Sequence, residues 1–284
     1  MKESLEGRNV SFKKRFPWLG FLALGGLGLM LALVILGPVF LPYAPDFQDL
    51  DSKFAPPSST HLLGTDYLGR DLAARLVHGA RISLSAAFFI LGIILVLGLV
   101  IGGLCGFVGG MVDKVIMRIC DVFLSLPTIV LSLFLVGVLG SGLENIILAI
   151  ALTHWAWYAR IVRGLVLNLK SKDFVLLSSS FGLSPWQNFK TNILLPLVSQ
   201  CLVLATMDIG HIILHIAGLS FLGLGVQPPQ AEWGVLLSDS KDYMWSNPEL
   251  LLYPGLALFI TIALFNLLGD SLRDYFDIDL KALH

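Results

Sequence analysis

The longest uncharged stretch of the chain constrains its fold more than any other feature. Residues 82–112 contain no Asp, Glu, Lys or Arg, and a helix of about 20 mainly apolar residues crosses a bilayer. Charged residues make up only 14% of the chain, compared with about 25% in soluble domains. Six segments are long and apolar enough to span a membrane, at about 18–41, 84–107, 117–139, 144–165, 196–220 and 250–269. The sequence therefore predicts an all-α integral membrane protein with six transmembrane helices.

The positions of Lys and Arg predict the orientation of these spans. Cytoplasmic loops of membrane proteins carry an excess of both residues. With the N-terminus in the cytoplasm, 14 of the 19 Lys and Arg residues fall on the cytoplasmic side and 5 on the outer side. We therefore expect a multi-pass protein of the cell membrane with both termini in the cytoplasm. The apolar run at 18–44 is too long for a cleaved signal peptide, so we expect it to remain as an anchor.

The spans divide the chain into five parts. These are a cytoplasmic N-terminus (1–17), the first transmembrane helix (18–41), an outer loop (42–81), a five-helix core (82–272) that includes a cytoplasmic loop at 171–196, and a cytoplasmic C-terminus (273–284). In the outer loop, the spacing of Asp66, Arg70 and Asp71 favours ion pairs that staple the loop, with contact to an extracytoplasmic partner as the alternative. A second outer loop, 221–249, would either close over the outer mouth or lie on the membrane; its notable residues are Glu232, Trp233 and Trp245.

Composition excludes some kinds of function. A net charge of −1 argues against a nucleic-acid partner, which needs a basic surface. Cys105, Cys120 and Cys201 show no metal-ligand spacing and lie in apolar surroundings, so we expect them to be buried hydrophobic residues.

The cytoplasmic loop at 171–196 reads SKDFVLLSSSFGLSPWQNFKTNILLP. A short helical stretch at 175–180 is broken by Gly182. Ser184 then precedes Pro185 as an N-cap residue before a proline at the first helical position, and a second stretch runs to Leu195. Two short helices at an angle would form a projection that a soluble partner could grip.

This loop resembles the coupling loop of binding-protein-dependent ABC importer permeases. Their pattern is Glu-Ala-Ala, three residues, Gly, nine residues and Ile-x-Leu-Pro. Gly182 matches the glycine, and the end of the pattern is matched by Ile193, Leu195 and Pro196. Two departures are clear: the Glu-Ala-Ala positions hold Leu176, Leu177 and Ser178, and ten residues rather than nine separate Gly182 from Ile193.

Other stretches extend the resemblance to nearly the whole chain from 42 to 279. They are HLLGTDYLGRD (61–71), RLVHGARISL (75–84), MRICDVFLSLP (117–127), LSFLGLG (219–225), AEWG (231–234) and FNLLGDSLRD (265–274). Together they look like the second permease of the dipeptide, oligopeptide and nickel importer group. HWAWYAR (154–160) and TMDIGHIILHIAGLSFLGLG (206–225) are similar to the nickel branch of that group.

The resemblance implies a type I ABC importer permease fold and a set of partners. The chain would pair with a second homologous permease and form the pathway at their interface. Two cytoplasmic ATPase subunits would dock on the coupling loops, and an extracytoplasmic binding protein would deliver the cargo. ATP would be used by the ATPases, so no cofactor is expected on this chain, which also lacks a GxxxxGK[ST] phosphate loop. The residues expected to contact the ATPase are Asp173, Leu176, Leu177, Ser178, Gly182 and Leu183.

Polar residues within the fifth span are candidates for lining the pathway. At 100° per residue, Asp208, His211 and His215 share one helix face within about 60°. A buried Asp near mid-membrane costs about 2.5–3.5 kcal/mol on insertion scales, so it needs a partner or water. We expect this stripe, with Met207, to line the pathway. The i, i+4 pair His211 and His215 could share a nickel ion, although hydrogen-bonded helix packing explains the stripe as well.

Residues of the third and fourth spans are also predicted to have structural or functional roles. His154 lies about 15 Å below Glu144 on the fourth span and could reach the stripe, although a hydrogen-bonded core histidine is the simpler interpretation. Asp121 and Arg118 are three residues apart and are expected to form an ion pair near the inner membrane boundary, while Pro127 is expected to kink the third span.

The sequence thus predicts the permease subunit of an ATP-driven importer, most consistent with nickel or a metal chelate as cargo. A di- or oligopeptide importer keeps the same fold and changes only the cargo. An intramembrane metalloenzyme using His211 and His215 is a hypothesis of another class, although no Glu follows His211 as in HExxH. A passive channel would conduct without ATPase partners.

Overall fold

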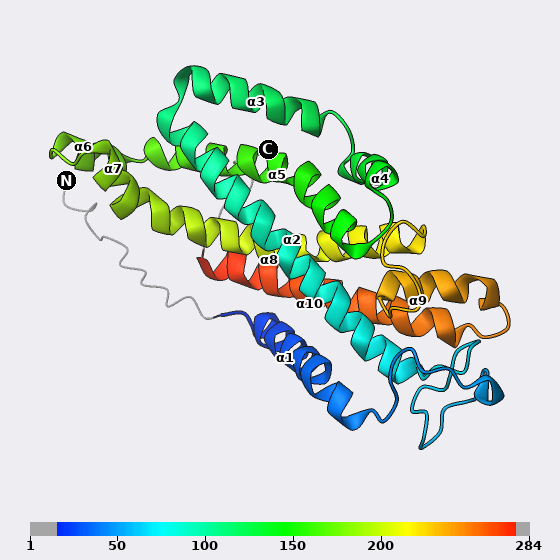
Figure 1. Cartoon of the computed structure of the whole chain (residues 1–284). Helices are drawn as coiled ribbons and strands as arrows, with labels where there is room; N and C mark the ends of the chain where they lie inside the picture. The colour runs from blue at the N-terminus through cyan, green and yellow to red at the C-terminus, as the bar shows by residue number, and fades with distance from the viewer. Residues whose placement is uncertain (1–15, 277–284) are drawn as a thin grey trace.

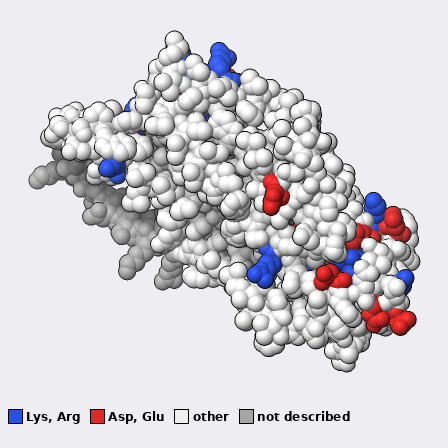
Figure 2. Space-filling view, viewed as in Figure 1, with Lys and Arg blue, Asp and Glu red and all other residues white. Residues whose placement is uncertain are grey.

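The computed structural model describes residues 16–276, and within them the chain is a bundle of helices (Figure 1). The helices are α1 (Trp18–Phe40), α2 (Leu72–Val108), α3 (Gly110–Leu124), α4 (Thr128–Leu139), α5 (Leu143–Lys170), α6 (Asp173–Ser180), α7 (Pro185–Asn188), α8 (Leu194–Phe221), α9 (Trp233–Ser240) and α10 (Glu249–Phe276). Single turns lie at Leu50–Ser52 (η1), Phe189–Ile193 (η2, a π-helical turn) and Lys241–Tyr243 (η3). On the face shown in Figure 2, charged side chains gather at the end that carries the outer loop and α9, a few others are scattered, and most of the remaining surface is uncharged.

Five of the described helical segments are long and apolar enough to cross a membrane, and a broken pair supplies the sixth. The five are α1, α2, α5, the continuous helix Pro185–Phe221 that contains α8, and α10. The sixth span consists of α3 and α4, which meet at an angle of 83°. The prediction of an all-α membrane protein with six spans is confirmed.

The third span is not the single kinked helix that the sequence predicts. α3 ends at Leu124, and α4 begins at Thr128 with Pro127 as its N-cap. Proline has no N–H to donate and disfavours a helical conformation in the residue before it, so both Leu126 and Pro127 oppose continuation of the helix. The break between α3 and α4 is the result, and the two helices meet at 83°.

The second helix is longer than the predicted span. α2 begins at Leu72, where the Asp71 carboxylate accepts a hydrogen bond of 2.7 Å from the backbone N–H of Ala74. The last ten residues of the predicted outer loop, 72–81, are therefore helical. Hydropathy marks only the apolar part of a helix and therefore does not reveal this capped start.

Small residues bring α2 close to α5, and the two helices form the centre of the core. Gly98, Gly102 and Gly106 repeat at every fourth position of α2. A Cβ on Gly102 would lie 2.3 Å from the carbonyl oxygen of Ala159, and one on Gly98 would lie 2.5 Å from the Cβ of Tyr158. This spacing is the small-residue pattern by which membrane helices approach one another closely.

An ionic cluster joins the outer loop to α9. Arg70 Nε donates to Asp66 Oδ2 at 2.6 Å, and Arg70 Nη2 and Arg75 Nη2 lie 3.1 and 3.3 Å from Asp239 Oδ2. Burial lowers the pKa of Arg70, but Asp66 and Asp239 together raise it above its ordinary value. The predicted pairing of Asp66 with Arg70 is confirmed, whereas Asp71 caps α2 and contacts His61 Nδ1 at 2.9 Å.

The second outer loop is held to the bundle by two buried residues, and its closure over the outer mouth stays a prediction. Trp233 is 2% exposed and donates its indole N–H to the carbonyl oxygen of Leu76 at 3.1 Å. Glu232 is fully buried and accepts a hydrogen bond of 2.8 Å from Ser83 Oγ. These two residues fix α9 against α2, and of the three residues only Trp245 is exposed, at 90%.

Candidate functional site

The polar residues of α8 meet His154 of α5 within the membrane-spanning part of the bundle. His154 Nε2 lies 3.0 Å from Asp208 Oδ2, and His211 Nδ1 lies 3.7 Å from Asp208 Oδ1. Asp208 is buried, whereas the side chain of His211 is 70% exposed. The Asp208 carboxylate is thus held between the half-buried imidazole of His154 on one side and the exposed imidazole of His211 on the other. Such an arrangement can present negative charge and imidazole nitrogen to a cation or a polar cargo.

The other two predicted residues lie around this centre. His215 is half-buried one turn beyond His211 on the same helix. Met207 is half-buried and lies against Gly269 of α10, so its contact is with a different helix. Among residues 16–276, no group of three or more His, Cys, Asp or Glu side chains is arranged to hold a metal ion. Ligation of metal by His211 and His215 therefore stays a prediction.

Tyr158 is a member of this region that the sequence analysis did not select. Its hydroxyl and His154 Nδ1 are buried and form no hydrogen bond with any residue from 16 to 276. Buried polar atoms of native proteins are usually hydrogen-bonded, so this pair is unusual. The signal was present in the sequence, since Tyr158 follows His154 by four residues and therefore lies on the same face of α5.

The predicted projection between α5 and α8 forms as expected. α6 and α7 are two short helices, and Ser184 and Gln187 form a reciprocal capping box at the start of α7. Gly182 joins them with a φ of +92°, a conformation that glycine adopts at little cost. Asn188 holds the two helices together by donating to the carbonyl oxygen of Val175 at 2.8 Å and to Ser179 Oγ at 2.7 Å.

The residues expected to contact an ATPase lie on the surface of this projection. Asp173, Leu176, Leu177 and Gly182 are exposed, whereas Ser178 and Leu183 are half-buried. Large apolar side chains are exposed around them; these are Phe174, Leu176, Leu177, Phe181 and Trp186. An exposed apolar patch of this kind marks an interaction surface.

The one-residue departure from the family spacing coincides with the π-helical turn at Phe189–Ile193. A π-helical turn closes i→i+5 hydrogen bonds and so encloses one residue more than an α-helical turn. It lies between Gly182 and Pro196, where ten residues rather than nine separate Gly182 from Ile193. The π-helical turn can thus accommodate the additional residue within the helix.

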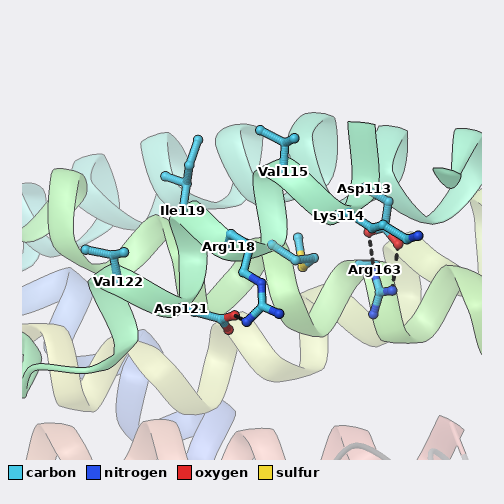
Figure 3. Close-up of a pocket in the computed structure, with 9 residues that line it drawn as sticks. Asp113, Lys114, Val115, Arg118, Ile119, Asp121, Val122 and Arg163 are labelled. Atoms are coloured by element: carbon cyan, nitrogen blue, oxygen red, sulfur yellow. Dashed lines mark hydrogen bonds and ion pairs between the residues drawn. The ribbon is translucent and has the colours of Figure 1, made fainter. Parts of the chain in front are cut away.

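A charged groove of about 960 Å³ lies along α3 beside α5 (Figure 3). The predicted pair of Arg118 and Asp121 is present at 3.6 Å, but Asp121 also accepts a shorter hydrogen bond from Arg160 of α5. A second pair joins Asp113 Oδ2 to Arg163 Nη2 at 2.7 Å. These pairs attach α3 to α5.

Comparison with known proteins identifies relatives over nearly the whole chain. Residues 95–281 match the family described as "Binding-protein-dependent transport system inner membrane component". The chain is 48% identical over 267 residues to the nickel transport system permease protein NikC of Escherichia coli K12, covering 94% of this chain and 96% of that protein.

Permeases named for other cargoes are also similar. The glutathione transport system permease protein GsiD of Pectobacterium atrosepticum is 40% identical, with 89% of this chain and 85% of that protein covered. The probable D,D-dipeptide transport system permease protein DdpC of Escherichia coli K12 is 38% identical, with 88% and 84% covered. The length and strength of these matches show that the chain belongs to the family of binding-protein-dependent transport system inner membrane components.

Proposed function

We propose that this chain is the permease subunit of an ATP-driven importer whose cargo is nickel or a metal chelate. The observation that carries the proposal is the 48% identity to a nickel permease over 94% of the chain. The identity exceeds the 40–42% found for the glutathione permeases and the 38% found for the dipeptide permease. The polar cluster of Asp208 with His154 and His211 gives this resemblance a chemical basis, since carboxylate and imidazole are suitable contacts for Ni²⁺.

In this proposal the polar cluster lines the pathway, with His215 and Met207 on the same helix. Contacts with the cargo are few, which suits transport because conduction requires binding weak enough for release. His211 is exposed and would meet the cargo, while His154 fixes the orientation of the Asp208 carboxylate from behind. A chelated metal would meet these groups through the polar atoms of its chelator.

The projection of α6 and α7 is proposed as the docking site for a cytoplasmic ATPase. Its exposed apolar side chains need cover, and the contact residues proposed are Asp173, Leu176, Leu177, Ser178, Gly182 and Leu183. ATP would be hydrolysed on the ATPases, and this chain would bind no cofactor. Closure of the ATPases would move the projection as a lever on α5 and α8, which flank it. A second permease and an extracytoplasmic binding protein complete the proposed importer, with both termini of this chain in the cytoplasm.

Peptide cargo is the second candidate, because two of the similar permeases are named for glutathione and a dipeptide. A passive channel would differ from both by conducting without ATPases. The intramembrane metalloenzyme is excluded, because the relatives are permease subunits of transporters and not enzymes.

The proposal is tested by reconstituting the chain with its second permease, ATPases and binding protein in vesicles. ATPase activity would be measured with nickel, nickel chelated by small organic acids or histidine, and dipeptides. We expect stimulation by nickel or a chelate, reduced in Asp208→Asn and retained in the control Thr206→Val, which lies two residues away on α8. Stimulation by dipeptides alone would replace nickel with peptide as the cargo.

A further inference from the structure

The groove along α3 contains more positive than negative charge. Eight of its nine lining residues come from α3 and the ninth is Arg163 of α5. Asp113 accepts two hydrogen bonds from Arg163, at 2.5 and 2.7 Å, so this pair is internally neutral. Figure 3 shows Asp113 directed toward Arg163.

The second carboxylate of the groove, that of Asp121, is also paired with cations. Asp121 accepts a short hydrogen bond from Arg160, and Arg118 Nη1 lies farther away, at 3.6 Å. Lys114 forms no ion pair with any residue in the described range 16–276. The four cations Lys114, Arg118, Arg160 and Arg163 exceed the two carboxylates Asp113 and Asp121 by two charges. Arg118 shares Asp121 with the closer Arg160, so Lys114 and Arg118 together carry the charge that the two carboxylates do not neutralise.

These two cations are accessible. Lys114 is exposed, and the side chain of Arg118 is 87% exposed. Arg118 lies on one stripe of α3 with three apolar residues at i, i+4, i+7 and i+11 spacing. The apolar residues of the stripe are also exposed, Met111 at 74%, Val115 at 53% and Val122 at 69%. The surface therefore combines basic and apolar groups, as an amphiphile requires of its binding site.

α3, which supplies most of the groove's lining, lies toward the end of the bundle that carries α6 and α7 (Figure 1). At that end, Lys170 Nζ donates to the carbonyl oxygen of Phe107 at 3.0 Å, which joins the last turns of α5 and α2. Arg163 is seven residues before Lys170, or about 10 Å along the helix. The charged groups thus mark the boundary of the apolar part of the bundle, where lipid headgroups lie.

We propose that the groove between α3 and α5 binds an anionic phospholipid, with Lys114 and Arg118 contacting its phosphate and Val115 and Val122 contacting its acyl chain. Basic pockets between membrane helices bind such headgroups, and two uncompensated cations complement one phosphate of a phosphatidylglycerol or both phosphates of a cardiolipin. With both termini in the cytoplasm, as in the proposed function, this lipid would belong to the cytoplasmic leaflet. That placement rests on the proposed function, whereas the binding itself does not. Nickel transport could be disproved while this binding persists.

The test uses the full chain purified in mild detergent and depleted of lipid. Binding of dioleoylphosphatidylglycerol and of dioleoylphosphatidylcholine would be compared by native mass spectrometry. We expect preferential binding of phosphatidylglycerol that weakens at high ionic strength. Replacing one cation should weaken this binding about fivefold, and Lys114→Gln with Arg118→Gln should weaken it about thirtyfold, because each Lys or Arg near a lipid surface contributes a similar free energy.

Two controls separate this interpretation from a structural effect. Arg273→Gln removes a basic residue that already pairs with Asp270 at 3.1 Å, and it should leave lipid binding unchanged. Lys114→Arg with Arg118→Lys keeps both charges and should retain preferential binding. Equal binding of the two lipids by the wild-type chain would overturn the proposal. Loss of the second permease from the double Gln variant with lipid binding unchanged would also overturn it, because the surface would then be a permease contact.

Discussion

His154 Nε2 and Asp208 Oδ2 lie 3.0 Å apart although 54 residues separate them in the chain. This contact connects α5 and α8, the two helices that flank the projection of α6 and α7. A movement of the projection would therefore reach both sides of the polar cluster. The pair is the link between the proposed coupling surface and the proposed pathway.

Replacing His154 with Phe should destabilise the protein, because Asp208 would remain buried without its imidazole partner. Leaving a buried polar group unsatisfied costs about 1–3 kcal/mol. His154→Gln can still donate a hydrogen bond and should lose less stability. Thermal unfolding in detergent measures both variants, and equal stability of His154→Phe and wild type would show that the contact contributes nothing.

Replacement by alanine should affect stability differently at the adjacent positions Gly102 and Gly103. A Cβ on Gly102 would lie 2.3 Å from the carbonyl oxygen of Ala159, whereas nothing lies within 4 Å of a Cβ on Gly103. Gly102→Ala should separate α2 from α5 and cost about 1–3 kcal/mol, as overpacking usually does. Gly103→Ala should be neutral or slightly stabilising. Unfolding midpoints of the two variants provide the comparison, and similar values would contradict the close approach.

The structure has room for a side chain at position 182, but the backbone conformation there is one that residues other than glycine rarely adopt. No atom lies within 4 Å of a Cβ at this position, but its φ is +92°. A side chain there should cost about 1–2 kcal/mol locally and alter the angle between α6 and α7. Gly182→Trp is expected to hydrolyse ATP without uptake in the reconstituted importer.

Gly137→Ala is the matched control for Gly182, since it also has free space and lies inside α4. Its uptake per ATP hydrolysed should equal that of wild type. Normal uptake by Gly182→Trp would contradict the proposal that the projection of α6 and α7 moves α5 and α8 as a lever.

The exposed apolar side chains of the projection should matter for assembly. Leu177 is 57% exposed, and Leu177→Asp places a charge on the proposed ATPase contact. We expect at least a tenfold loss of co-purified ATPase, since a buried unpaired charge at an interface costs about 2–5 kcal/mol. Trp245→Asp changes a side chain that is 90% exposed on another loop and should leave assembly intact. Undiminished co-purification of the ATPase with Leu177→Asp would refute this contact.

Local signals in the sequence predicted much of the fold. Long apolar runs gave the spans, and Ser184 with Pro185 gave the start of α7. The rise per residue placed His154 at the depth of the α8 stripe, and the structure brings it to Asp208. These predictions succeeded because each depends on one helix and its period.

The features that the sequence did not reveal depend on contacts between distant segments. The buried Glu232 accepts a hydrogen bond from Ser83, 149 residues away, and no local pattern contains that information. Pro127 indicates a break in the third span, but packing of α3 and α4 on α5 sets the 83° angle. The start of α2 depends on a single cap at Asp71, which a hydropathy window does not detect.

Uptake of cargo tests the central claim most directly. Vesicles containing the reconstituted importer would be supplied with ATP, binding protein and either radioactive nickel, with and without chelator, or a radioactive dipeptide. The account predicts ATP-dependent accumulation of nickel, reduced at least tenfold in Asp208→Asn, with little accumulation of dipeptide. ATP-dependent accumulation of the dipeptide that is indifferent to Asp208, His211 and His215, without accumulation of nickel in either form, would contradict it.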